Sequence, residues 1–481
     1  MRQARLTHIA LIAAGNIHPR APQASTPVTQ VTFRTYPMRI VVSLKNQTGL
    51  FPKVTVASSI LLLHTACAMA TIFYVATNGS DSNNGSPSHP LATIAKALTL
   101  ATASGDQIQL EAGTYNVPNV IAGYEDGNVY AAVNLLTSAN SGITIEADPG
   151  DTTRPVLNFS AINPTGYRVA AFWVPAGVSN VTFQGFDVTG LQENITTTNN
   201  QSVGFGVYGC TGCTWNQVNV HDGECAGFYL EKAAANNTFY ECDAYNLTGI
   251  NSYSYGNADG FGCHPAAGGT GNVYNACRSW NNSDDGYDCL NASTQVTFEY
   301  CWSYKNGNNG GNGNGFKVGG WGSTPQNQIP NPLPAHIVKY CLSADNASHG
   351  FYCNHQPGQA ATWTNNTAYN NSGPDFDTLE RTAPNYSSSS PQTDSNDIPG
   401  VAEVMHYNLG YAGYSVTGDY NESGSIVTDN SWTESITLTN SDFVSTDATQ
   451  MTEARQSNGS LPTITFMHQV SGSPGAGLGC F

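Results

Sequence analysis

The sequence predicts an all-β chain: a right-handed parallel β-helix, or solenoid, whose N-terminal end is closed by a short capping helix. Three observations support this fold. Only 11% of the 481 residues are charged, and glycine and asparagine, which are poor helix formers, are abundant. With 40% hydrophobic and 10% aromatic residues, the chain is too apolar to be disordered. From about residue 180, a pair of short strand motifs recurs with a variable period.

The first 70 residues differ from the rest. They hold seven basic residues and no acidic residue, and the apolar run Val54 to Leu63 is followed by small residues from Ala66 to Ala70. A basic region, a short apolar core and a small-residue cleavage site are typical of a secretory signal peptide. We therefore expect residues 1–70 to be a signal peptide with an N-terminal extension of uncertain role. Residues 71–481 would then form one secreted, extracellular domain. The alternative is that the apolar run is a buried first strand.

Charge narrows the choice of partner. Residues 71–481 keep 10 of the 17 basic residues and all 34 acidic ones, which gives a formal charge of −24. This charge disfavours nucleic acid as a partner, and the apolar run is too short to span a membrane. An acidic polysaccharide would also be repelled unless a cation bridges it to the protein. We expect the domain to be a monomer.

The domain opens with an expected strand, Ile72–Ala76, and a second expected strand follows at Gln107–Leu110. Between them, the segment Leu91–Thr102 places Ile94 and Leu98 at helical spacing. A helix at this point would cover the apolar interior at the open end of a solenoid.

Two strand motifs then recur in turn. The first begins at a cysteine or small residue and ends at asparagine, and its copies are 242–246, 277–281, 301–306, 341–346 and, more weakly, 367–370. The second reads Gly-aromatic-x-apolar, and its copies are Gly227–Leu230, Gly260–Cys263, Gly286–Cys289, Gly315–Val318 and Gly350–Cys353. The glycines are 33, 26, 29 and 35 residues apart. Each interval predicts one coil with insertions at a turn, and the asparagines can form a hydrogen-bonded ladder between coils.

Alignment of the second strands on their glycines brings charged residues together. Since side chains alternate along a strand, the aromatic residues point inward and the residue after each points outward. The outward column is Tyr229, Gly262, Asp288, Lys317 and Tyr352. The column before the glycines is Ala226, Asp259, Asp285, Asn314 and His349. Asp288 and Lys317 would thus be neighbours on successive coils, about 4.8 Å apart.

Four carboxylates, Asp259, Asp284, Asp285 and Asp288, therefore converge beside Lys317. Oxygen-only anionic ligands select a hard cation such as calcium (Ca²⁺). Lysine is scarce, because only five follow residue 70, so its place beside the cluster is informative. The alternative is that the aspartates are ordinary turn residues and that Lys317 is a salt-bridge partner.

Cysteines and glycosylation sites say less. Eleven of the 12 cysteines follow residue 70, and an odd number leaves at least one thiol free. Cys210 and Cys213 form a CxxC motif without a second pair, so a zinc site is not expected, and a local disulfide or buried thiols remain open. Sequons at Asn246, Asn291 and Asn346 suit a secreted glycoprotein.

The segments Asn257–Phe261, Cys277–Asp288 and Asn314–Gly320 resemble the active-site motifs of polysaccharide lyase family 9. That family comprises pectate and exopolygalacturonate lyases on a right-handed parallel β-helix, and the similarity covers roughly residues 73–475. The resemblance implies a catalytic lysine at Lys317, and it implies calcium-binding aspartates at Asp259, Asp284, Asp285 and Asp288. Some relatives act on rhamnogalacturonan. The expected partner is therefore an acidic polysaccharide, either pectate (polygalacturonate) or rhamnogalacturonan.

The reaction implied by this resemblance is calcium-dependent β-elimination, with Arg278 and Lys305 as expected helpers in substrate binding. Two alternatives remain. An inverting glycoside hydrolase would use Asp284 and Asp285 as its two carboxylates, with His349 as an auxiliary group and no metal. A non-catalytic glycan-binding solenoid would bind polysaccharide without creating new chain ends. Removal of calcium by EDTA separates the first two, because it stops only the lyase.

Overall fold

The computed structural model describes residues 70–193, 195, 201–250, 254–320, 330, 332–354, 361–378, 403–418 and 425–481. The expected signal peptide therefore lies almost wholly outside the described residues. The chain divides into two compact units, and the described residues all belong to the second, Ala66–Phe481. Among the helices of the described segments, none is long and apolar enough to cross a bilayer.

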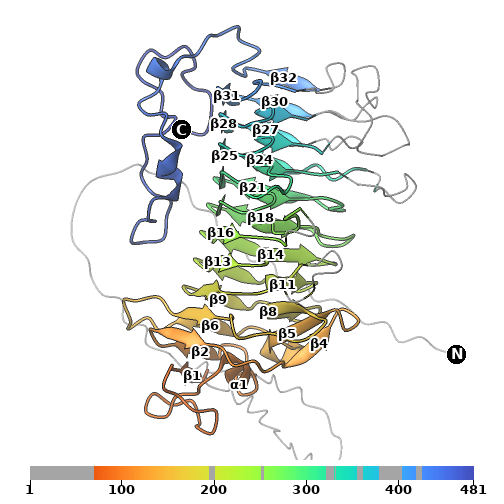
Figure 1. Cartoon of the computed structure of the whole chain (residues 1–481), viewed down its shortest axis with the longest axis vertical. Coiled ribbons are helices and arrows are strands. Elements are labelled where there is room, and N and C mark those ends of the chain that lie inside the picture. The colour runs from red at the N-terminus through yellow and green to blue at the C-terminus, as the bar shows by residue number, and fades with distance from the viewer. Residues whose placement is uncertain are drawn as a thin grey trace, which may run out of the picture. The chain divides into compact units, whose positions relative to one another are not determined.

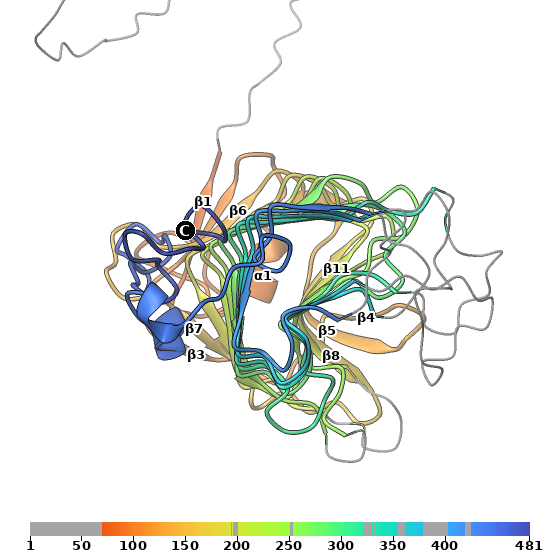
Figure 2. The same ribbon diagram turned by 90° about the horizontal axis from the view of Figure 1, so that it is seen from above.

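Three sheets form the walls of a parallel β-helix, and successive coils add one strand to each (Figures 1 and 2). The first sheet contains β1 (Ile72–Val75), β2 (Gln107–Leu110), β6 (Thr144–Ala147), β9 (Thr182–Gln184), β12 (Thr214–Asn216), β15 (Thr238–Tyr240), β18 (Asn272–Asn275), β21 (Val296–Glu299), β24 (Ile337–Lys339), β27 (Thr362–Thr364), β30 (Val404–His406) and β32 (Ile426–Thr428). Its strands all pair in parallel, which confirms the predicted solenoid.

The second and third sheets follow the same order along the axis. The second contains β3 (Thr114–Asn116), β7 (Val156–Asn158), β10 (Asp187–Thr189), β13 (Asn219–Gly223), β16 (Asp243–Leu247), β19 (Arg278–Trp280), β22 (Trp302–Tyr304), β25 (Leu342–Ala344), β28 (Thr367–Tyr369) and β31 (Leu409–Tyr411). The third contains β4 (Gly123–Glu125), β5 (Tyr130–Leu135), β8 (Arg168–Pro175), β11 (Val203–Tyr208), β14 (Ala226–Glu231), β17 (Phe261–Cys263), β20 (Tyr287–Asp288), β23 (Phe316–Lys317), β26 (Phe351–Tyr352) and β29 (Phe376–Asp377). Of these pairings, β4 with β5 is antiparallel.

The interior is built from stacks of like residues. One aromatic stack runs through eight strands of the third sheet, with ring centroids 4.5 to 5.3 Å apart and planes within 15°. Its members are Phe172, Phe205, Phe228, Phe261, Tyr287, Phe316, Phe351 and Phe376. All are buried. The aromatic residue after each glycine therefore points inward, as the alignment predicted, and the residue that follows it points outward.

An asparagine ladder lines the turn between the second and third sheets, although not at every predicted position. The ladder consists of Asn282, Asn306, Asn346 and Asn371. Each side-chain oxygen accepts a backbone N–H from the preceding coil. Asn346 and Asn371 also accept the side-chain N–H of the preceding asparagine. The alignment also placed Asn246, Asn281 and Asn370 in this ladder, which is wrong by one residue. They occupy the preceding position, where the backbone is left-handed, with φ of 55°, 59° and 52°. Asparagine tolerates that conformation well, and Asn281 Nδ2 there donates to Asn246 Oδ1.

The cysteines are free thiols in the described part of the chain, and all but Cys480 are buried. Four of them stack just before strands of the second sheet, at Cys242, Cys277, Cys301 and Cys341, and each Sγ–H donates to a backbone carbonyl. Of the two interpretations left open for the CxxC motif, the structure supports buried thiols.

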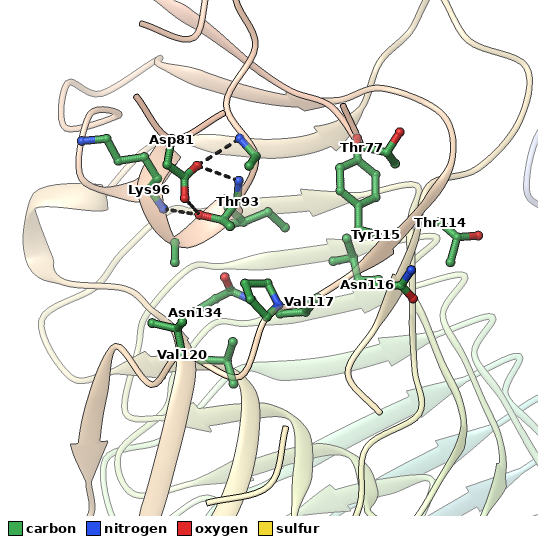
Figure 3. Close-up of a pocket in the computed structure, with 16 residues that line it drawn as sticks. Thr77, Asp81, Thr93, Lys96, Thr114, Tyr115, Asn116, Val117, Val120 and Asn134 are labelled. Atoms are coloured by element: carbon green, nitrogen blue, oxygen red, sulfur yellow. Dashed lines mark hydrogen bonds between the residues drawn. The ribbon is translucent and has the colours of Figure 1, made fainter. Parts of the chain in front are cut away.

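The capping helix α1 (Ile94–Leu98) is shorter than the segment the sequence predicted. Asp81 accepts the backbone N–H groups of Ala92 and Thr93, and Thr93 caps the helix by accepting the N–H of Lys96 (Figure 3). At the other end, the Thr99 hydroxyl donates to the Lys96 carbonyl and ends the helix. A pocket of about 510 Å³ lies beside α1, and it contains none of the residues expected to carry chemistry.

Short 3₁₀ helices also occur among the described residues, at η1 (Ser138–Asn140), η5 (Asn440–Asp442) and η6 (Ala448–Thr452). The C-terminal segment that contains η5 and η6 packs against the outer face of the second sheet (Figure 2), where it buries Trp302, Leu342 and Leu409.

Candidate active site

The outward column of the third sheet has the predicted register. Gly262 of β17 pairs with Asp288 of β20, and Asp288 pairs with Lys317 of β23. Tyr229 precedes this series and Tyr352 follows it. The strand alternation thus places the carboxylate of Asp288 and the amine of Lys317 on the same face, on successive coils.

The column before the glycines is also confirmed by backbone hydrogen bonds. The N–H of Gly260 donates to the Asp285 carbonyl, and the N–H of Gly286 donates to the Asn314 carbonyl. Glycine is required here because the serine of the neighbouring second-sheet strand fills the space of a side chain: a Cβ atom on Gly286 would collide with Ser303 Oγ. The two repeated motifs therefore interlock at this corner, and they hold the aspartates that precede the glycines in place.

Three of the four predicted ligands come together. One carboxylate oxygen from each of Asp259, Asp285 and Asp288 lies within 4.8 Å of the others, and all three residues are buried. Asp284 is adjacent but differently engaged, because its two oxygens accept the backbone N–H groups of Asn257 and Asn312.

Lys317 closes the cluster. Its Nζ lies 3.1 Å from Asp285 Oδ2, 3.0 Å from Asp288 Oδ2 and 3.3 Å from Asn312 Oδ1. Only 6% of Lys317 is exposed to solvent. A long cationic side chain that is buried to this degree is held by its anionic partners rather than by water.

The cluster carries more negative than positive charge, and the pKa values reflect it. Burial and repulsion by the other aspartates raise the pKa of Asp259 well above its usual range. Burial raises the pKa of Asp285 to about 7, although Lys317 opposes the rise. Burial also disfavours the charged form of Asp288, but Lys317 and His264 outweigh it and lower the pKa of Asp288. The pKa of Lys317 is raised well above its usual value by the carboxylates, against the effect of burial.

The donor set fits a hard divalent cation. Its donors are carboxylate oxygens, which are the ligands that Ca²⁺ prefers. Four buried carboxylates face one lysine, and burial together with repulsion between the aspartates raises the pKa of Asp259 and Asp285. A cation held by Asp259, Asp285 and Asp288 would supply the missing positive charge.

The structure does not bring Arg278 to this cluster. Arg278 lies on β19, 4% exposed, and donates to Asp243 over 3.0 and 2.7 Å. Its remaining nitrogen donates to the carbonyls of Met451 and Glu453 in the C-terminal segment. The guanidinium therefore has a structural role, and the expectation that it helps to bind substrate has no support in the geometry. Lys305 is exposed and lies in the turn after β22, where its backbone is left-handed. Its role in substrate binding stays a prediction.

Sequence reasoning missed the residues that orient the cluster. Asn312 contacts both Lys317 and Asp284, and it belongs to a glycine- and asparagine-rich insertion that gave no residue-specific signal. Asn314 donates its backbone N–H and its Nδ2–H to Asp285 Oδ1. The alignment placed Asn314 in the column before the glycines. It did not show that the Asn314 amide would donate a hydrogen bond to a carboxylate of that column.

Comparison with known proteins also identifies a right-handed β-helix and relatives named as pectate lyases. Residues 73–396 match the family model described as "Pel9A-like, right handed beta helix region", which confirms the predicted handedness. The chain is 30% identical over 419 residues to pectate lyase L of Dickeya chrysanthemi, with 84% of each chain covered. It is 27% identical over 337 residues to pectate lyase PEL9 of Emericella nidulans, with 64% of this chain and 75% of that protein covered.

Two solved structures are similar over most of their length. A rhamnogalacturonan lyase matches with a TM-score of 0.76 and 31% identity, covering 85% of this chain and 100% of that one. Pectate lyase Pel9A matches with a TM-score of 0.62 and 25% identity, covering 85% of this chain and 91% of that one.

Proposed function

The chain belongs to the Pel9A-like family of right-handed β-helix polysaccharide lyases, and from this premise we propose that it is a secreted, calcium-dependent lyase that cleaves a pectate-type polysaccharide by β-elimination. One observation carries the proposal: the buried triad Asp259, Asp285 and Asp288 lies beside a buried lysine on the next coil.

The carboxylates of Asp259, Asp285 and Asp288 would hold the cation, with Asp284 as the fourth expected ligand. A bound Ca²⁺ supplies positive charge that binds a uronate carboxylate of the substrate and acidifies its neighbouring C5 proton. Asp284 also fixes the surrounding loops, because its oxygens bind the backbone at Asn257 and Asn312. This leaves Lys317 to move the proton.

Lys317 acts as the base in this mechanism. The neutral amine takes the proton from C5, the electron pair of the C5–H bond forms the C4–C5 double bond, and the C4–O glycosidic bond breaks. The departing oxygen takes a proton from solvent. The base must first lose its own proton, although the carboxylates raise the pKa of Lys317. A cation held by the carboxylates would leave them less able to stabilise the Lys317 ammonium, which would lower the pKa of Lys317. Because the amine must still lose a proton before it can act, we expect an alkaline pH optimum.

The two alternatives have less support. A hydrolase would need Asp284 and Asp285 as its acid and base, but Asp284 binds two backbone N–H groups and Asp285 binds Lys317 and Asn314. A binding surface alone gives no reason to bury a lysine among four aspartates, because burying charges costs free energy that a glycan-binding face does not need.

The test is incubation with polygalacturonate and Ca²⁺, with ultraviolet absorbance of an unsaturated product as the readout. We expect absorbance to rise with calcium and to stop rising with EDTA. New chain ends without absorbance would indicate a hydrolase, and binding without new chain ends would indicate a binding protein. Either result would contradict the proposal.

Substrate choice is tested by parallel initial rates on polygalacturonate, rhamnogalacturonan and highly methylated pectin. A free carboxylate is an anionic oxygen ligand, whereas its methyl ester is neutral. We therefore propose that polygalacturonate, or another pectic backbone with free carboxylates, is cleaved much faster than highly methylated pectin. Equal or faster cleavage of methylated pectin would exclude activation through a carboxylate-bound cation.

A further inference from the structure

A chain of hydrogen bonds runs from the carboxylate cluster into the next coils. Asn314, in the turn before β23, donates its backbone N–H and its Nδ2–H to Asp285 Oδ1 over 2.7 and 2.8 Å. The other oxygen of that carboxylate, Asp285 Oδ2, lies 3.1 Å from Lys317 Nζ. Asn314 therefore fixes the rotation of the Asp285 carboxylate and determines which oxygen faces Lys317.

His349, one coil further along, holds Asn314 from the opposite side. The Asn314 Oδ1 accepts the backbone N–H of His349 over 3.3 Å and lies 2.8 Å from its ring Nδ1. The other ring nitrogen, Nε2, lies 3.2 Å from Asp377 Oδ2 on β29. The ring also stacks on Tyr352, with centroids 4.1 Å and planes 4° apart. Tyr352 is the neighbour of Lys317 in the outward column.

The donor and acceptor roles along this chain orient the His349 ring. Because Asn314 Nδ2 donates to a carboxylate, its Oδ1 faces His349 and can only accept, so Nδ1 donates. The Ser348 hydroxyl, 2.9 Å from the same nitrogen, can accept part of that bond. On the other side of the ring, Nε2 lies against Asp377 Oδ2, so the His349 side chain bridges Asp377 and Asn314.

We propose that His349 is a positioning residue of the metal site, which acts through Asn314 to fix the Asp285 carboxylate. The proposal rests on the calcium site of the proposed function. Without the ring of His349, only the longer 3.3 Å bond from the His349 backbone N–H holds the Asn314 oxygen. The Asn314 amide can then swing away from Asp285, and its Nδ2–H bond to Asp285 Oδ1 weakens. The carboxylate would then lose its fixed orientation toward both Lys317 and the cation.

The experiment is calorimetric titration of calcium chloride into the metal-free whole chain. Loss of a residue that orients a ligand weakens metal binding by about 10- to 100-fold. We therefore expect a loss of this size in His349→Ala and in Asn314→Ala. Because both act on the same carboxylate, the double variant should bind no more weakly than Asn314→Ala alone.

His221→Ala is the matched control. His221 pairs with Asp222 over 2.7 Å and stacks on Tyr245 with centroids 4.7 Å apart, but it lies on the second sheet. Its loss should leave calcium affinity within about twofold of the original. Where circular dichroism shows that His349→Ala does not fold, Asp377→Asn carries the test, because it removes the anion that holds Nε2 and should weaken calcium binding in the same direction.

Activity at saturating calcium separates positioning from contact with substrate. A positioning role predicts that excess calcium returns kcat of His349→Ala to near the original value. Unchanged calcium affinity in His349→Ala, or additive losses in the double variant, would overturn the inference while leaving the lyase proposal intact. If the unmodified chain bound no calcium at all, the proposed function and this inference would fail together.

Discussion

Two clusters of buried charge lie on the outside of the coils, and they differ in their numbers of acidic and basic residues. On the second sheet, Asp243 sits between Arg278 and Arg455, with N–O distances of 2.7 and 2.6 Å. On the third sheet, four aspartates face one lysine. Burial disfavours the charged form of Asp243, but the two arginines outweigh it and lower its pKa. Burial and mutual repulsion instead raise the pKa of Asp259 and Asp285.

The difference separates a structural cluster from a functional one. Asp243 and its arginines are joined to the C-terminal segment, because Arg455 belongs to it and Arg278 donates to its carbonyls. Each charged group of that cluster has its partners within the protein, because Asp243 binds both arginines and their remaining N–H groups donate to backbone carbonyls. The third-sheet cluster sets four aspartates against one lysine, and a site with this excess of buried anionic charge is the kind in which pKa values are perturbed for function.

The largest expected effect is on catalysis. Lys317→Ala should lower kcat by about 10²–10⁴-fold or more, because the base is lost. Calcium affinity should remain, since the carboxylates stay in place. Steady-state rates on polygalacturonate with calorimetry of the same variant check both. Retention of more than a few per cent of the original kcat would remove Lys317 from the mechanism.

Changes in the second-sheet cluster around Asp243 should instead lower the free energy of unfolding. Asp243→Ala leaves two buried arginines without their anion, and breaking a buried pair in this way costs about 3–5 kcal/mol. Chemical denaturation measures the loss, and the rate per folded molecule should not change. A stable variant with lowered activity would show that this cluster also serves the active site.

A smaller loss is expected from Arg455→Ala. Asp243 keeps Arg278, so the cost is that of charged hydrogen bonds rather than of the whole cluster, about 1.5–3 kcal/mol. The same denaturation experiment applies. If this loss equalled that of Asp243→Ala, Arg278 would be contributing nothing, and the description of Asp243 as shared by two arginines would be incorrect.

The smallest effect has the opposite sign. The pKa of Asp285 is raised to about 7, so in metal-free protein the unfolded chain releases this proton before the folded one does. Stability from this group is therefore full below about pH 4 and lost as the pH rises toward 7. Asp285→Asn should remove that decline and stabilise the metal-free protein at pH 8 by at least about 1.4 kcal/mol, the equivalent of one pKa unit. Its calcium binding should disappear. A destabilised Asp285→Asn variant at pH 8 would mean that Lys317 already compensates the buried anions of the third-sheet cluster.

The sequence predicted the third-sheet cluster because its geometry depends on local alternation. Once the glycines are aligned, the side of the sheet on which Asp288 and Lys317 lie follows from counting residues. The ladder prediction was wrong by one residue at Asn246, Asn281 and Asn370 because the turn contains a left-handed residue that the alignment could not place. The role of Arg278 could not be predicted at all, since its partners in the C-terminal segment are more than 170 residues away in the sequence.

The division of labour between Asp284 and the triad was also beyond the sequence. Asp284 and Asp285 look equivalent in the sequence motif. Of the two, only Asp285 occupies the column before the glycines, and its carboxylate faces Lys317. Asp284 is taken up by backbone N–H groups at Asn257 and Asn312, in loops whose course no strand pattern determines.

The continuous aromatic stack under the third sheet works as a ruler. Rings in contact from Phe172 to Phe376 leave no room for one coil to slide toward the next, so positions along the axis come in whole steps of about 4.8 Å. The separation between the base and its carboxylates cannot be tuned by shifting a strand. This separation can change only through the length of the side chains. Lys317→Arg keeps the charge but moves the donors and removes a titratable amine. It therefore tests how strictly the distance between the base and its carboxylates is set by the lysine side chain.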